Sequence, residues 1–243
     1  MTNRNQSESQ RDQAEPDNGR ADFSADMAQA RQRLHAVSEL ALQQYEQALN
    51  AYQHNDVRLA QQVLSQLQRA QDFELAMDDH CLDMLSHTAS NRDLRLVLAL
   101  LKAISDIEQI CHQNVQIAQQ VLLYTATPPS AKQLAAISTL AKPVGTIMGL
   151  ALAALHQRDI VMAEQALSIA PAVHQCYGAI LRGNLAEQQQ AAQLDATLSV
   201  NWVARALERI AEHSTNLARQ AIFMARVSSG HSSRVELQPR LPR

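Results

Sequence analysis

The sequence is poor in the residues that build sheets and tight turns. Aromatic residues make up only 3% of the 243 residues, and there are six glycines and seven prolines. Strands favour aromatic and β-branched residues, and hairpins need glycine or a similar residue at their turns. Hydrophobic residues reach 46% all the same, and alanine and leucine, both strong helix formers, are prominent among them. This composition predicts an all-α protein.

The chain also lacks a strong charge of either sign. Its net charge of −3 comes from 21 basic and 24 acidic residues, which argues against nucleic acid as the main partner. No run approaches the ~18 uninterrupted apolar residues of a membrane span, so no membrane insertion is expected. Residues 1–20 contain no apolar stretch typical of a secretory signal. Cys81, Cys111 and Cys176 form no CxxC pair, which predicts reduced core cysteines in a cytoplasmic protein.

Apolar residues recur at helical spacing in six stretches between two polar ends. The ends, residues 1–24 and 230–243, are too polar to bury a core, so we predict a disordered N-terminal tail and a flexible C-terminal tail. Pro143 and Pro171 fall inside two of the stretches and are expected to kink or split those helices. The predicted helices span about 25–53, 56–87, 92–125, 130–156, 159–184 and 187–227.

Parts of the first half are repeated in the second half, in the same order. The segment ALNAYQHNDVRLAQQVLS recurs as ALAALHQRDIVMAEQALS, and DIEQICHQNVQIA recurs as ALERIAEHSTNLA. Asp56 and Asp159 occupy the same place in the first pair, between two helices, where each can cap the second helix. A tandem duplication is the simplest explanation. It predicts two antiparallel three-helix bundles with up-down topology, over residues 25–127 and 130–229.

The second repeated segment places a glutamate within or beside an apolar helix face in each copy. Glu108 is followed four residues later by His112, and Glu208 by Glu212. Residues at this spacing lie on one helix face, close enough to share a metal ion. A pair of carboxylates suits hard cations, whereas a glutamate and histidine pair favours zinc or iron. The spacing alone fits an ordinary solvated helix face as well.

The two copies resemble the signature of the PhoU family, which reads approximately D-L-E-R-I-G-D-H-A-x-N-I-A and occurs once in each three-helix repeat. Asp93, Leu94 and Arg95 also resemble the D-L-R opening of the helix that carries this signature. The resemblance covers about residues 27–230. It implies two symmetric three-helix bundles in a cytoplasmic protein.

The resemblance also implies a function without catalysis. PhoU-like proteins are negative regulators of the phosphate-starvation response and of phosphate homeostasis. They contact the ATPase of the Pst phosphate transporter and a sensor histidine kinase. Members can bind metal clusters through acidic residues of the signature, so a divalent or iron-type metal is an implied cofactor. A homodimer is also expected.

The first copy departs further from the signature than the second. Its metal positions would be Glu108 and His112, whereas the second copy has Glu208 and Glu212. We therefore expect stronger metal binding in the second repeat. The supporting signature residues of the second copy are Arg209, His213 and Asn216.

Two other kinds of function fit the same residues. One is a metal-binding helical bundle with no role in phosphate regulation. The other is a degraded paralogue that acts as a structural dimer. Trp202, the sole tryptophan, is expected in the core or on a dimer face.

Overall fold

The structure, a computed structural model, describes residues 16–86, 90–123, 128–187 and 194–229, and within these ranges it contains helices and no strand. The all-α prediction is therefore confirmed. Five of the seven helices correspond to five of the predicted stretches, and the other two, α2 and α3, divide the sixth stretch between them. The helices are α1 (Pro16–His54), α2 (Val57–Ser65), α3 (Leu67–Ser86), α4 (Asn91–Leu123), α5 (Ala131–Gln157), α6 (Ile160–Glu187) and α7 (Leu194–Ser228).

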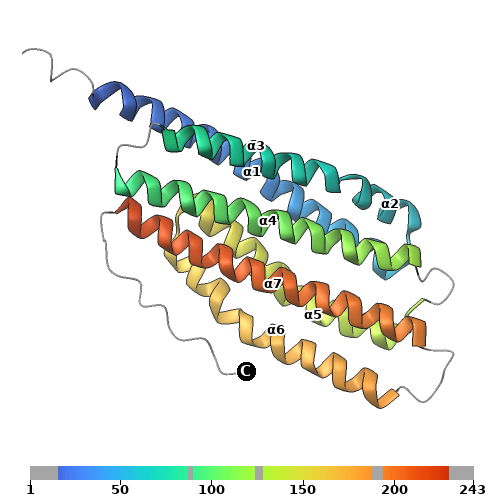
Figure 1. Cartoon of the computed structure of the whole chain (residues 1–243). Helices are drawn as coiled ribbons and strands as arrows, with labels where there is room; N and C mark the ends of the chain where they lie inside the picture. The colour runs from blue at the N-terminus through green and yellow to red at the C-terminus, as the bar shows by residue number, and fades with distance from the viewer. Residues whose placement is uncertain (1–15, 87–89, 124–127, 188–193, 230–243) are drawn as a thin grey trace, which may run out of the picture.

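The helices form two tandem three-helix bundles, as the repeats predicted. In the first bundle α1 packs on α4 and on α2 and α3, and in the second α5, α6 and α7 pack on one another. Figure 1 shows α4 and α7 side by side in the middle, with the other helices of each bundle on the outer sides. α1 also contacts α5. Because of these contacts, the buried apolar residues of both bundles form one continuous core.

The links between the first two helices of each bundle have matching geometry. Asn55 and Arg158 adopt left-handed backbone conformations, with φ of 52° and 56°. The next residue then caps the following helix. Asp56 accepts a hydrogen bond from the Leu59 amide at 2.9 Å, and Asp159 accepts one from the Val161 amide at 2.8 Å. The predicted capping by both aspartates is confirmed, and the equal geometry supports the duplication.

The bounds of two predicted helices differ from the structure. α1 begins at Pro16, so residues 16–24, predicted as part of a disordered tail, are helical. Proline is well suited to the first position of a helix, and Phe23 anchors this stretch by packing on the core. The second predicted helix is interrupted at Gln66. The backbone N–H of Gln66 donates to the carbonyl oxygen of Val63, three residues earlier, at 3.1 Å, which is the hydrogen-bond spacing of a 3-10 turn.

The prolines do not split their helices. α5 continues through Pro143 and α6 through Pro171. Each proline removes one backbone hydrogen bond, but the turns on both sides remain packed against the other helices of the second bundle. The predicted tails at residues 1–15 and 230–243 lie outside the described residues.

α5 has the length and apolar composition of a membrane-spanning helix, and it is the one helix of the described residues that does. Its apolar side chains, among them Ile137, Leu140, Val144 and Ile147, are buried against neighbouring helices. A buried core helix passes the same test of composition. The packing thus accounts for the apolar sequence of α5.

Polar bonds reinforce the contact between α1 and the second bundle. The Tyr45 hydroxyl donates to the carbonyl oxygen of Ala141 at 2.6 Å, and the Tyr52 hydroxyl lies 3.1 Å from that of Ser199. Burial raises the pKa of Tyr52 to about 12, so this phenol stays protonated at neutral pH. A Cβ atom on Gly145 would lie 3.1 Å from the Tyr45 ring, so the glycine leaves room for the ring to approach α5.

Candidate functional site

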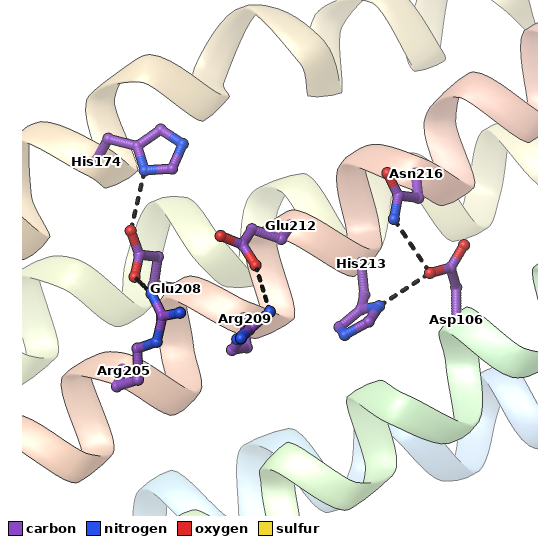
Figure 2. A network of polar contacts seen from close by, with 8 residues as sticks. All are labelled: Asp106, His174, Arg205, Glu208, Arg209, Glu212, His213 and Asn216. Carbon is purple, nitrogen blue, oxygen red and sulfur yellow. Dashed lines mark hydrogen bonds and ion pairs between the residues drawn. The ribbon is translucent and has the colours of Figure 1, made fainter. Parts of the chain in front are cut away.

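Glu208 is the buried member of the second signature, on α7. The residue is only 6% exposed. One of its carboxylate oxygens accepts a hydrogen bond from Arg205, one turn earlier, and the other lies 3.1 Å from Nδ1 of His174 on α6 (Figure 2). Burial would lower the pKa of Arg205, but the hydrogen bond and the charge of Glu208 outweigh it and raise that pKa. The buried carboxylate is thus compensated by a guanidinium from its own helix.

Glu212 does not share a partner with Glu208. It pairs with Arg209 at 3.2 Å, and both side chains are more than a third exposed. Figure 2 shows the two glutamates held by different arginines. The spacing correctly places the two residues one turn apart on α7, but each has its own cationic partner.

The remaining signature residues of α7 bond to α4. Asp106 Oδ1 lies 2.9 Å from His213 Nδ1 and accepts a hydrogen bond from Asn216 Nδ2 at 3.3 Å. Asp106 comes from the first repeat, so this cluster joins the two bundles. The signature residues of the second copy therefore contact two different helices. Glu208 lies toward α6, whereas His213 and Asn216 lie toward α4 (Figure 2).

The first copy has a different environment around its glutamate. Glu108 is 5% exposed and accepts a hydrogen bond from Gln109 Nε2 at 2.9 Å, a neutral donor. Burial, and after it the charge of Glu108, raises the pKa of Glu74 on α3, and a hydrogen bond from Ser105 opposes this rise. His112 is 3.1 Å from Gln116 Nε2. The first copy therefore buries a carboxylate close to a second acidic residue.

Asp93 and Arg95, the other signature residues, lie at the start of α4. The Ser90 hydroxyl donates to Asp93 Oδ2 at 2.6 Å and accepts from the Asp93 amide at 3.1 Å. This arrangement caps α4. Arg95 lines a surface groove between α4 and α7. Neither residue lies among the polar contacts of Figure 2.

The residues do not fit a metal ion in this arrangement. Both oxygens of Glu208 are already bonded, to Arg205 and His174. Within the described part of the chain, no three His, Cys, Asp or Glu side chains are grouped closely enough to hold a metal. A metal at Glu208 would have to displace its present partners. Metal binding by Glu208, Glu212, Glu108 and His112 stays a prediction.

Several residues of these networks were not among the site residues predicted from the sequence. His174 is an isolated histidine, Arg205 lies three residues before Glu208, and Asp106 is the first residue of the first signature copy. Glu74, whose pKa the charge of Glu108 helps to raise, lies on α3, whereas Glu108 lies on α4. Arg205 could have been found from its i,i+3 spacing to Glu208, and Asp106 from its match to the aspartate that opens the signature. The others could not, because their partners come from distant parts of the chain.

The arrangement of the repeats agrees with the comparison to known families. A family model described as PhoU domain matches residues 34–121 and again residues 137–221. The chain belongs to the PhoU family. Each match spans most of one three-helix bundle, and together they contain both copies of the signature.

Other PhoU proteins are similar over most of their length. A "Phosphate-specific transport system accessory protein PhoU homolog" from Burkholderia sp is 26% identical over 208 residues, which cover 84% of this chain and 88% of that protein. The PhoU homolog of Pseudomonas aeruginosa is 27% identical over 209 residues, 84% of this chain and 85% of its own.

Two crystal structures have the same fold. PhoU from Pseudomonas aeruginosa superposes with a TM-score of 0.81 at 25% identity, over 84% of this chain and 99% of that one. The phosphate transport system regulatory protein PhoU from Streptococcus pneumoniae has a TM-score of 0.76 at 18% identity, over 86% and 97% of the two chains, and so shows the fold alone. The tandem bundles are thus an arrangement known from solved PhoU proteins.

Proposed function

We propose that this PhoU protein is a cytoplasmic accessory regulator of phosphate uptake, and that it restrains the phosphate-starvation response when phosphate is plentiful. The observation that carries the proposal is that the PhoU domain model matches the chain twice, over residues 34–121 and 137–221. The names of its relatives, which call them accessory proteins of the phosphate-specific transport system, support the link to phosphate transport. Contact with the Pst transporter ATPase and with a sensor histidine kinase is the mechanism we propose.

The use of the signature residues supports a function by contact. Glu208, His213 and Asn216 bond to side chains of their own protein and connect α7 with α6 and α4. Such bonds hold three long helices in register. A rigid body of this kind can present its outer helix faces to a partner with little loss of conformational entropy on binding.

Trp202 supports the homodimer that belongs to this proposal. The residue is 57% exposed on α7, so the predicted location in the core is wrong. The other predicted location, on a dimer face, is compatible with this exposure. Exposed Leu198, one turn earlier on α7, extends the apolar surface. Light scattering on wild-type protein and on Trp202→Glu tests the dimer, and a monomeric wild type would contradict it.

The experiment that tests the regulation is a clean deletion of the gene in the source organism. A reporter of a phosphate-starvation gene should then be active in phosphate-rich medium, and the wild-type gene supplied in trans should silence it. Co-purification with the transporter ATPase and with the kinase tests the proposed contacts separately. Unchanged reporter output in the deletion strain would contradict the regulatory role and favour a structural paralogue.

A further inference from the structure

A groove of about 450 Å³ runs along the surface where α4 meets α7. From α4 it is lined by the stretch Arg95 to Lys102, and from α7 by the stretch Arg219 to Arg226. Each stretch covers two helical turns, a length of roughly 10 Å. The groove lies at the end of the α4–α7 contact where α4 begins and α7 ends (Figure 1).

The floor of the groove is apolar. Leu98 is 45% exposed there, and Phe223 is partly buried against the core. Exposed Leu94 lies one turn before Leu98 on α4 and extends the apolar strip. Apolar surface that is hollowed and exposed in this way is typical of binding sites.

The rim of the groove is basic. Lys102, Arg219 and Arg226 line it, and among the described residues none of these three forms an ion pair with a carboxylate. Arg219 donates only to the amide oxygen of Asn216, at 3.1 Å. Arg95 also lines the groove, but it has an interaction of its own. No acidic side chain from the described part of the chain lines the groove, although the full sequence carries a net charge of −3.

An adjoining hollow places one acidic residue near two of these cations. This hollow, of about 340 Å³, shares Lys102 and Arg219 with the groove and contains Asp106. Asp106 is bonded to His213 and Asn216 and is largely buried. Among the described residues, Asp106 forms its ion pair with His213 and with neither Lys102 nor Arg219.

We propose that this basic groove binds an acidic amphipathic helix of a partner protein. Apolar side chains at positions i, i+3, i+4 and i+7 of such a helix cover about the same 10 Å as the floor. Acidic residues on its flanks would meet the rim cations. A small anion would leave the floor uncovered, and a neutral helix would leave the cations unpaired. The inference deepens the proposed regulation by protein contact and rests on it for its biological meaning.

The probe is a fluorescein-labelled synthetic peptide of about 18 residues, long enough to form a marginal helix. It carries leucine at the anchor positions and glutamate elsewhere, and binding to the full-length protein is measured by anisotropy. The variant Lys102→Glu with Arg219→Glu should weaken binding more than about tenfold, because it reverses two rim charges. Raising the salt from about 50 to about 300 mM should also weaken binding.

The matched control is Arg31→Glu with Lys142→Glu. It changes the net charge equally, at exposed cations of α1 and α5 outside the groove. The control should bind the peptide within about twofold of wild type. Leu98→Ser should weaken binding without changing the charge. Equal affinity of the two charge-reversal variants, or no effect of Leu98→Ser, would overturn the proposal.

Two further measurements distinguish other occupants. If inorganic polyphosphate or ATP displaced the peptide at lower concentration than an unlabelled peptide, the ligand would be a small anion and the helix proposal would be wrong. If Lys102→Glu with Arg219→Glu abolished a dimer seen by light scattering, the occupant would be a second copy. The reporter assay uses a strain in which deletion of the gene activates the starvation reporter. If this variant silenced the reporter normally there, the groove would have no role in regulation, whereas the proposed regulatory function would still stand.

Discussion

Replacing Arg205 by alanine tests whether Glu208 depends on an internal cation. The Glu208 side chain is 8% exposed, and after the substitution only His174, whose side chain is 59% exposed, would face it. Breaking a fully buried ion pair costs about 3–5 kcal/mol. Arg205 is 42% exposed, so solvent screens its charge and the cost should be smaller, about 1–2 kcal/mol at neutral pH.

Urea denaturation measures this loss as a lower unfolding midpoint at unchanged slope. Arg209→Ala is the matched control on the same helix, because it breaks the exposed pair with Glu212 and should cost at most about 0.5 kcal/mol. Adding Glu208→Gln to Arg205→Ala should recover most of the lost stability, since the neutral amide needs no counter-charge. Equal losses in the two arginine variants, or no recovery with glutamine, would refute the reasoning.

Three more predictions concern the bundle interface and the signature. Tyr45→Phe should lower the free energy of unfolding by about 0.5–1.5 kcal/mol in urea titrations, because it removes the bond to Ala141, and an unchanged midpoint would show that this bond adds no net stability. Burial, and then the charge of His35, lowers the pKa of His156 below 6.5. As the pH falls below about 6.5, His156 is protonated in the unfolded state before it is protonated in the folded state. The free energy of unfolding should therefore fall as the pH is lowered, and His156→Gln should make this decline shallower. Purified Arg205→Ala should take up more Mn²⁺ than wild type by elemental analysis, because the substitution frees an oxygen of the buried glutamate, and equal uptake would count against that carboxylate as a ligand.

The sequence determined the features that depend on neighbours along the chain. Helical spacing of alanine and leucine defined the long helices, and the repeated segments indicated two bundles. Asp56 and Asp159 could be assigned as caps because a cap acts within its own turn. The place of Glu108 and Glu208 in or beside an apolar face was visible in the sequence, whereas their burial is a finding of the structure, because the same spacing also fits a solvated helix face. The start of α1 at Pro16 was missed because a polar helical turn looks much like a polar tail.

Only the tertiary structure decided which partner each polar side chain has. The i,i+4 spacing put Glu208 and Glu212 on one face of α7, but packing gave Glu208 a partner on α6 and gave His213 a partner on α4. The contact of Asp106 with His213 joins residues from different repeats, so no local pattern predicts it. The basic groove has the same origin, because its walls are cations of α4 and α7 that meet only when the two bundles pack. A periodic pattern specifies the face of a helix, whereas the packing of helices decides what that face meets.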